Sequence, residues 1–599
     1  MACSKLFSGD LPEITNLIIQ FLRNDLRSLY SCVLVNRLLC RITIPILWED
    51  PFAVMRRDGR TYDFLITYLL FLNNDDKAKL KEFGVEINSL SFKKPFFNYP
   101  SFIKTLNTFR VELHVVNLIN NLFVTNNITT CSISQIQRPL PNTLKSDKIT
   151  FAPIFNVENT SLELEQHPIS SSKIIDFICV SLFKLFISNE ISLNNLYLNI
   201  NYYHLNFISQ LCKFISDNPK FLSGIKDFTL DFSHKYRNIF AYPVLYPFQS
   251  FLMSLPSVLT SSIKHFSIYF GFDKEMLTAR NLERLIQSQT QLLSLSFYSI
   301  TANVAYLLGC LNYSSNTLTS IKFNYCDFTN ISSFNGLNYL SHLESLQFIH
   351  CKGITVRVFQ PLLNIPTPLK IKTLKLEGQI AETVFIQLLL QKAGSYVENL
   401  ELKLWVDVER KRVFESIIKY CDKIQFLHLY EIDYVNIPQL HKLITQVRKN
   451  LKYLSLQNKN YHPPYILLSG NKDNLRVSSM ILENLGQILP SSLNYLDLNL
   501  VIDPTNFKDF LDNCKHFVRL SRLLVKNKNI KEIDDTFNIL KKFVKENEVT
   551  NFAYQVNSCF NPDDFEHQNL EKLVNDIQPS IKMNKYSDLV IRISDFDYF

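Results

Sequence analysis

A short hydrophobic motif, apolar-x-x-apolar-x-apolar, returns at regular intervals along the C-terminal two thirds of this sequence. Six consecutive copies have their middle apolar residue at Ile321, Leu346, Leu374, Leu400, Leu427 and Leu454. The steps between these positions are 25, 28, 26, 27 and 27 residues. Further copies begin at Leu193, Ile225, Ile263, Leu292, Leu493 and Leu520. Alternating apolar positions predict a short strand in each copy, and the constant period predicts an array of repeated structural units.

Apolar runs with helical spacing lie between the copies, for example at 384–390, 413–418 and 440–444. A strand-plus-helix unit of this length resembles the leucine-rich repeat. One such unit cannot bury its strand face and its helix face alone, whereas stacked units bury both. We therefore expect an α/β fold in which residues 191–599 form a curved leucine-rich-repeat solenoid, with parallel strands on the concave face and helices on the convex face.

The first 54 residues have a different pattern, which predicts three short helices. Pro12 and Glu13 suit a first helical turn, where proline loses no hydrogen bond and an acid meets the positive end of the helix dipole. Asp25 is a good N-cap for a second helix. A third helix is expected at 37–42, ending before Pro45. So short a segment cannot bury all its large apolar side chains in its own core, so some should remain for a partner.

The stretches LPEITNLIIQFL, DLRSLYSCVLVNR and PILW resemble the F-box, a module that docks on the Skp-type adaptor of SCF ubiquitin ligases. The resemblance implies an adaptor-binding module at 8–54. It implies that the contacting residues are Leu11, Pro12, Ile14, Ile18, Leu22, Leu29, Cys32, Val35, Asn36 and Trp48. Leu39 stands where the family usually has tryptophan. The alternative is an ordinary helical cap on the N-terminal end of the solenoid.

Residues 55–190 connect the module to the array and follow no clear period. A helix is expected at 62–72, and residues 87–92 resemble a degenerate first repeat. The stretch 128–172 mixes Ser, Thr, Asn and Pro, which predicts a flexible insertion.

The composition of the 599 residues narrows the function. No run of about 18 apolar residues occurs, so no membrane association is expected, and the start of the chain lacks the pattern of a secretory signal, which favours the cytoplasm or the nucleus. The net charge of +8 is spread along the chain without a dense Lys/Arg block, which disfavours nucleic acid as a partner. The 12 glycines form no phosphate-binding loop or nucleophile elbow, so no enzymatic activity and no cofactor are expected.

The 12 cysteines are scattered singly, with no Cys-x-x-Cys pair and no histidine cluster at zinc spacing, so no metal site is expected. Cys326 and Cys351 each follow a predicted strand. We expect them to turn inward and help satisfy the loop backbone; the alternative is a reactive or metal-binding thiol.

Strand side chains alternate in direction, so the residues between the apolar positions should line the concave face in columns. Phe426, His428, Tyr430, Tyr453 and Tyr495 then form an aromatic cluster, with mixed charges nearby at Lys375, Glu377, Glu401 and Lys403. Solvent-facing aromatic residues are typical of protein-binding hot spots. The alternative is that strand tyrosines simply pack along the sheet surface.

Together these features predict a non-catalytic substrate receptor. The F-box would bind a Skp-type adaptor and through it a cullin-RING ligase, and the nine concave residues would bind a protein substrate, whose identity the sequence does not indicate. The second hypothesis is a leucine-rich-repeat protein-binding scaffold that recruits no ligase.

Overall fold

The computed structural model describes most of the chain. The described residues are 12–23, 25–53, 63–85, 95–126, 169–200, 205–232, 242–259, 263–270, 276–300, 309–380, 382–404, 410–458, 470–514, 520–528, 533–547, 549–556, 582–583 and 586–596. The chain divides into two compact units, residues 1–292 and 293–599.

The N-terminal unit begins with three helices, which are α2 (Pro12–Phe21), α3 (Leu26–Val35) and α4 (Arg37–Leu47). The Asp25 carboxylate caps α3 by accepting a hydrogen bond from the Ser28 amide at 3.1 Å, as predicted. The prediction that the third helix ends before Pro45 is wrong, since α4 continues through Pro45 to Leu47. Proline removes one backbone donor, and this loss so near the end of the helix does not stop the final turn.

The rest of the N-terminal unit contains a parallel sheet in sequence order, β1 to β4. Its strands are β1 (Thr105–Asn107), β2 (Asn195–Asn199), β3 (Asp227–Asp231) and β4 (His265–Tyr269). Its further helices are α5 (Asp63–Leu69), α6 (Asn74–Glu82), α7 (Thr108–Asn126), α8 (Ile169–Ser188), α9 (Leu205–Asp217), α10 (Tyr242–Val258) and α11 (Met276–Ser288).

The parallel sheet begins earlier in the chain than predicted. Strand β1 lies inside the region 55–190, so the parallel sheet already begins before residue 191. The predicted degenerate repeat at 87–92 lies outside the described residues, and so does the predicted insertion up to residue 168. The last four residues of that insertion belong to the start of α8.

The C-terminal unit continues the strand-and-helix pattern. Its strands are β5 (Ser294–Tyr298), β6 (Ser320–Asn324), β7 (Ser345–Ile349), β8 (Thr373–Gly378), β9 (Asn399–Leu404), β10 (Phe426–Ile432), β11 (Tyr453–Asn458), β12 (Tyr495–Leu500), β13 (Arg522–Asn527), β14 (Asn551–Val556) and β15 (Lys582–Met583). Its helices are α13 (Val356–Leu363), α14 (Thr383–Ala393), α15 (Arg410–Tyr420), α16 (Ile437–Val447), α17 (Gly470–Ile488), α18 (Pro504–Asn513), α19 (Ile533–Glu546) and α21 (Tyr586–Leu589).

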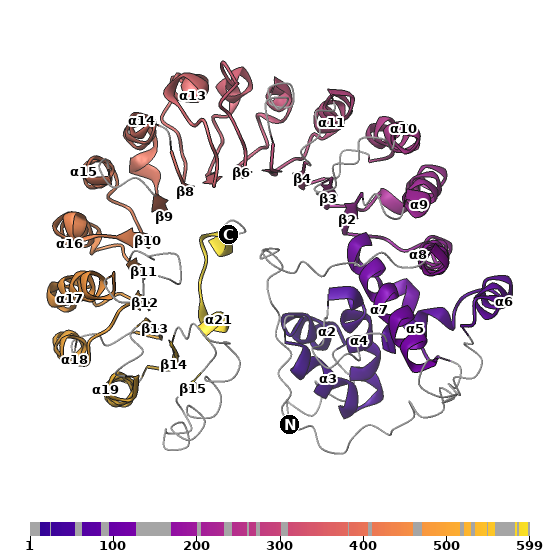
Figure 1. The fold of residues 1–599 in the computed structure, drawn as a ribbon, viewed down its shortest axis with the longest axis horizontal. Coiled ribbons are helices and arrows are strands. Elements are labelled where there is room, and N and C mark those ends of the chain that lie inside the picture. The colour runs from indigo at the N-terminus through magenta and orange to yellow at the C-terminus, as the bar shows by residue number, and fades with distance from the viewer. Residues whose placement is uncertain are drawn as a thin grey trace. The chain divides into compact units, whose positions relative to one another are not determined.

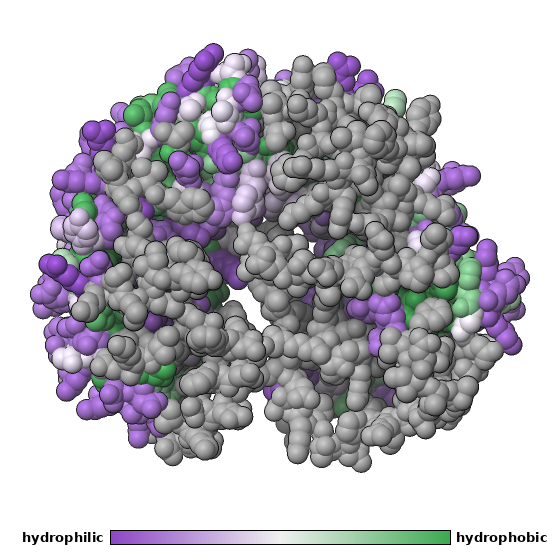
Figure 2. Space-filling view, in the orientation of Figure 1, coloured by the Kyte–Doolittle hydropathy of each residue, from purple (hydrophilic) through white to green (hydrophobic). Residues whose placement is uncertain are grey.

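In this unit neighbouring strands pair in parallel, and the sheet does not close into a barrel. Figure 1 shows the strands on the inner side of an arc and helices α13 to α19 on its outer side. The predicted α/β solenoid is therefore present, with its strands and helices on the expected sides. Figure 2 shows hydrophilic side chains over much of the outer edge along α15 to α18, where the helices meet water.

The repeated apolar motif forms the core of this unit. The three motif residues of each of the six predicted copies are buried, among them Leu318, Ile321 and Phe323. The register aligns the middle positions, because Ile321 pairs with Leu346, and Leu374 with Leu400. The rings of successive phenylalanines stack, with centroids 5.7 Å apart for Phe297 and Phe323. The period read from the sequence is thus the period of the packed core.

A forked backbone hydrogen bond joins most of the described repeats to the one before. The amides of Lys372 and Thr373 both donate to the carbonyl of Glu344, at 2.8 and 2.9 Å. The same fork recurs at the start of nearly every described strand, with acceptor carbonyls at Glu49, Lys104, Asn194, Lys226, Leu293, Thr319, Glu344, Lys372, Glu398, Gln425, Lys452 and Asn494. The fork aligns the start of each of these strands with the strand before it.

Cys326 and Cys351 turn inward as predicted. Their sulfur atoms lie 3.6 Å from the carbonyl oxygen of Phe297 and 3.4 Å from that of Phe323. Both side chains are buried, and burial raises the pKa of Cys326 well above its usual value. These cysteines therefore act as small core residues that satisfy the loop backbone.

None of the helices in the described ranges combines the length and the hydrophobicity that crossing a membrane requires.

Gly353 provides a test of how closely consecutive repeats approach. Its φ is +69°, and a Cβ atom added there would lie 2.3 Å from the backbone nitrogen of Thr329. We expect Gly353→Ala to lower the free energy of unfolding by about 3 kcal/mol, because backbone must move to make room. Gly84 is the matched control, since its φ is +82° but nothing lies within 4 Å of the added Cβ. Gly84→Ala should cost roughly 1 kcal/mol. Equal losses in the two variants, measured by urea unfolding, would contradict the close approach.

Candidate functional site

Helix α2 has one buried face and one exposed face, and both are apolar. Ile19 is buried with Leu29 and Leu39 in the small core of the three-helix module, and Leu22 packs against that core. The opposite face exposes Ile14, Leu17, Ile18 and Phe21, with exposed fractions of 45, 56, 39 and 88%. Leu34 and Val35, at the end of α3, are exposed as well. An apolar stripe at positions i, i+3, i+4 and i+7 in water is typical of a helix that binds a partner.

The predicted adaptor contacts divide into three groups, which are residues at least partly accessible, residues outside the described part of the chain, and residues engaged within the chain. Ile14, Ile18 and Val35 are exposed, while Leu22 and Cys32 are partly buried against the module's core. The side chains of Leu11 and Pro12 lie outside the described residues. The third group is engaged within the chain.

That third group consists of Leu29, Asn36 and Trp48. Leu29 is fully buried, so in this structure it is not available to a partner. The side-chain oxygen of Asn36 caps α4 by accepting from the Leu39 amide at 2.8 Å. The Trp48 ring lies 4.1 Å from that of Tyr99, measured between centroids. These three residues therefore stabilise the module and its attachment to the rest of the unit. Only the part of their surface that remains exposed could contact a partner.

The predicted columns on the strand face of the C-terminal unit are in register. Phe426 pairs with Tyr453 on the next strand, and Tyr453 pairs with Tyr495. Their ring centroids are 6.4 and 6.2 Å apart. Within β10, the rings of His428 and Tyr430 stack with centroids 3.9 Å apart. The structure thus brings the five aromatic residues together, as the repeat pattern predicts.

The prediction that this cluster faces solvent is wrong. Phe426 and Tyr495 are 0 and 1% exposed, and His428 is 7% exposed. Residues 586–596 lie over the face, with α21 against β13 and β14 and the short 3-10 helix η10 (Ile593–Phe596) against β8 and β9. Figure 1 shows this segment in yellow on the strand side of the unit. We call residues 586–596 the C-terminal segment.

The C-terminal segment contacts the aromatic cluster directly. The Phe596 ring lies 5.1 Å from that of Phe426 and 5.5 Å from that of Tyr453, between centroids. The backbone amide of Ile591 donates to the Tyr495 hydroxyl at 3.3 Å. Three of the predicted substrate-binding aromatic residues, Phe426, Tyr453 and Tyr495, are therefore in contact with the chain itself.

A buried carboxylate anchors the segment. Asp497 accepts a hydrogen bond from the Tyr586 hydroxyl at 2.5 Å and one from the Ser455 hydroxyl at 2.8 Å. Burial raises the pKa of Asp497 to about 6, although these two hydroxyls and the nearby Lys526 act to lower it. A carboxylate in this position is costly to ionise, and its hydrogen bonds only partly offset the lost hydration.

The four predicted charged residues form a closed network beside the cluster. Lys375 lies 2.8 Å from Glu401 and 3.3 Å from Glu377, and Lys403 lies 3.0 Å from Glu377. His350 adds a fourth contact, 3.3 Å from Glu377. Burial opposes ionisation of Glu377, but His350 and the two lysines hold its pKa well below the usual range. Two cations and two anions thus neutralise each other, which leaves little net charge to attract a polyanion.

His428 is not a source of positive charge at this face. Burial, together with Lys375 and Lys403, lowers the pKa of His428 to about 3. The imidazole is therefore neutral at physiological pH and contributes a flat, weakly polar surface to the cluster.

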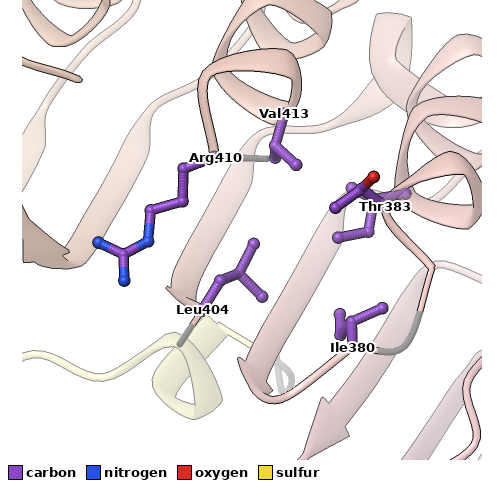
Figure 3. A pocket seen from close by; sticks show the side chains of 6 residues that line it. Ile380, Thr383, Leu404, Arg410 and Val413 are labelled. Carbon is purple, nitrogen blue, oxygen red and sulfur yellow. The ribbon is translucent and has the colours of Figure 1, made fainter. Parts of the chain in front are cut away.

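A small hollow lies between neighbouring repeats and is lined by Ile380, Thr383, Ile386, Leu404, Arg410 and Val413. Figure 3 shows Arg410 beside aliphatic side chains from the adjoining elements. The Arg410 guanidinium donates to the carbonyl of Glu431 and lies 3.4 Å from Asp433. Because the charge is already engaged, this hollow is a packing feature and not a substrate pocket.

The described residues contain no group of three or more His, Cys, Asp or Glu side chains that could hold a metal ion. The arrangement that they do contain is suited to binding. It consists of an exposed apolar stripe on α2 and a polar-aromatic strand face covered by a peptide segment.

Sequence reasoning missed the C-terminal segment. Tyr586, Leu589, Ile593 and Phe596 recur at spacings of three and four residues. That pattern could have indicated an amphipathic segment, but it follows the last clear repeat motif and was therefore easy to overlook.

No protein-family model matches the chain, and a search of curated proteins finds no significant match.

Asp497 provides a test of this buried site. Its folded pKa of about 6 lies above the value near 3.9 that an unfolded chain has, so the native state binds the proton more tightly. Between pH 4 and pH 7 the contribution of Asp497 to the free energy of unfolding should fall by about 2 kcal/mol. Asp497→Asn keeps an acceptor for Tyr586 and removes this dependence. Urea unfolding of both proteins should show that the free energy of unfolding of the variant, relative to that of the wild type, rises by about 2 kcal/mol from pH 4 to pH 7. A difference that does not change with pH would show that Asp497 titrates normally.

Proposed function

We propose that this protein is the substrate-recognition subunit of an SCF-type ubiquitin ligase, in which the three-helix module behaves as an F-box. The observation that carries the proposal is the exposed apolar stripe of α2, formed by Ile14, Leu17, Ile18 and Phe21. Fully burying an exposed side chain of this kind contributes roughly 1.5–3 kcal/mol, and the four residues keep 39 to 88% of their surface for such burial, so together they can support a stable complex. The F-box-like order of residues in the same helices suggests that the partner is a Skp-type adaptor.

The departure at Leu39 affects this proposal less than the sequence alone indicates. Leu39 is 2% exposed and packs with Ile19 and Leu29 in the module's core. A smaller side chain there changes the internal packing of the module, while the exposed stripe keeps its large apolar residues.

The attachment of the three-helix module to the first strand of the sheet also supports a receptor role. The amides of Lys104 and Thr105, at the first strand of the sheet, donate to the carbonyl of Glu49 at 2.9 and 3.0 Å. The module therefore joins the sheet through the same forked bond that joins one repeat to the next. This connection holds the module at a fixed position on the N-terminal unit, so that a partner bound to α2 is held there as well.

In this proposal the chain performs no chemistry. The ligase supplies the transfer of ubiquitin, and the solenoid binds the protein to be modified. The alternative is a scaffold whose helical module binds a different protein, and the experiment below separates the two.

The test is binding of the full-length chain to a purified Skp-type adaptor, measured by titration calorimetry. We expect wild-type binding and a loss of at least 100-fold in Leu17→Asp/Ile18→Asp, because each new carboxylate would have to be desolvated in the interface. Both residues are exposed, so the variant should keep the wild-type melting temperature.

Met253→Asp is the matched control, since Met253 is an exposed apolar residue on α10, 59% exposed, outside the module. It should bind the adaptor as the wild type does. Failure of the wild-type chain to bind, or equal binding by the double variant, would contradict the ligase proposal. Binding of another protein through the same stripe would instead support the scaffold.

A further inference from the structure

The C-terminal segment resembles a bound peptide more than a further repeat. It contains a single helical turn at 586–589, three residues without regular structure, and the 3-10 turn at 593–596. No residue of the segment is in a strand, although β8 to β14 lie beneath it. It therefore adheres to the sheet through side chains and not through the hydrogen-bond ladder that holds the repeats.

The segment has an apolar side and a polar side. Leu589 and Ile593 are buried against the sheet, and Tyr586 and Phe596 are half-buried at its two ends. Arg592, Ser594 and Asp595 are exposed on the outer side. Aromatic, aliphatic, aliphatic and aromatic anchors at positions i, i+3, i+7 and i+10 form the kind of pattern by which short peptides are recognised.

The surface beneath the segment is unusually polar for a permanent core. The Asp497 carboxylate and the Ser455 hydroxyl are buried, and the Tyr495 hydroxyl accepts a hydrogen bond from the Ile591 amide. Cores that are never hydrated rarely keep a carboxylate without a full set of partners, because its desolvation is costly. This surface can be hydrated again when the segment leaves, and the carboxylate then regains water.

The balance of contacts also favours reversible attachment. Two buried aliphatic side chains, two half-buried rings, the partly buried Val590 and Ile591 and the hydrogen bonds of Tyr586 and Ile591 oppose the conformational entropy of eleven ordered residues. Segments with so few buried contacts open locally far more often than the whole domain unfolds.

We propose that residues 586–596 are a displaceable intramolecular ligand of a peptide-binding surface on β8 to β14. When bound they close this surface. The external ligand that fits the open surface is a peptide segment carrying aromatic and aliphatic side chains at the spacing of Tyr586, Leu589, Ile593 and Phe596.

The tether makes this an autoinhibitory arrangement. A segment in the same chain acts at a high effective concentration, so a free peptide of the same sequence competes poorly with it. A partner must bind more tightly than the segment or act after the segment has been weakened. This inference does not depend on recruitment of a ligase by α2, and its test contains no adaptor.

The test uses full-length chains and a fluorescent peptide with the sequence of residues 584–599. In the chain variant Leu589→Asp/Ile593→Asp the resident segment is weakened while the surface beneath is unchanged. Fluorescence anisotropy should show that this variant binds the wild-type peptide at least tenfold more tightly than the wild-type chain does. A peptide carrying the same two substitutions should not bind either chain.

The matched control is the chain variant Arg592→Ala/Ser594→Ala, which changes only exposed side chains of the segment. It should bind the peptide as weakly as the wild type. If the Leu589→Asp/Ile593→Asp chain keeps the wild-type circular dichroism spectrum and still does not bind the peptide, the segment is not exchangeable and the proposal is wrong.

Hydrogen exchange on the wild-type chain provides a second measurement that needs no folded variant. The amides of residues 586–596 should exchange at least 100-fold faster than those of β12, because local release exposes them without unfolding the sheet. Equal protection of the two stretches would show that the segment is a permanent part of the core and would overturn the proposal.

Discussion

The forked hydrogen bond between consecutive repeats is the constraint on which the rest of the structure depends. Two successive amides donate to one carbonyl of the repeat before, as Lys372 and Thr373 do to Glu344. This bond fixes where each strand starts, and a strand that slipped by one residue would turn its core side chains outward. Because the register is kept from strand to strand, motif residues such as Ile321 and Leu346 lie side by side and stack into a continuous core. The same register aligns the residues between them, so that Phe426, Tyr453 and Tyr495 meet.

The fork also explains how an unrelated helical module can be attached to a repeat array. The carbonyl of Glu49, two residues beyond the end of α4, accepts the amides of Lys104 and Thr105 as if it belonged to a preceding repeat. Trp48, next to it, packs on Tyr99. The module is thus joined at a position that the sheet would otherwise leave as an unpaired edge, and such edges are a liability in β proteins. The exposed apolar stripe on α2 then remains available to bind a partner.

Much of the fold follows from the sequence because the period of the motif is the period of the packing. The buried positions, the helices between strands and the inward cysteines 326 and 351 were all predicted from spacing. Spacing does not distinguish the two apolar faces of α2, and so it could not show that Ile19 is internal while Ile18 is exposed. It also could not show that the strand face is covered, because Tyr586 reaches Asp497 from 89 residues further along the chain. A local pattern predicts which residues share a face, whereas the cover on that face is a long-range contact.

The covered face shows why polar and aromatic residues can occupy the inner side of a solenoid without weakening it. The core on the helix side supplies most of the apolar burial, so the strand side need not be apolar to hold the repeats together. Lys375, Glu377, Glu401 and Lys403 neutralise one another there, and His428 stays uncharged. Such a surface tolerates exposure to water and can also pack against aromatic side chains such as Phe596. A surface with both properties suits a ligand that binds reversibly, because these four charged residues pair with one another and need no partner from the segment.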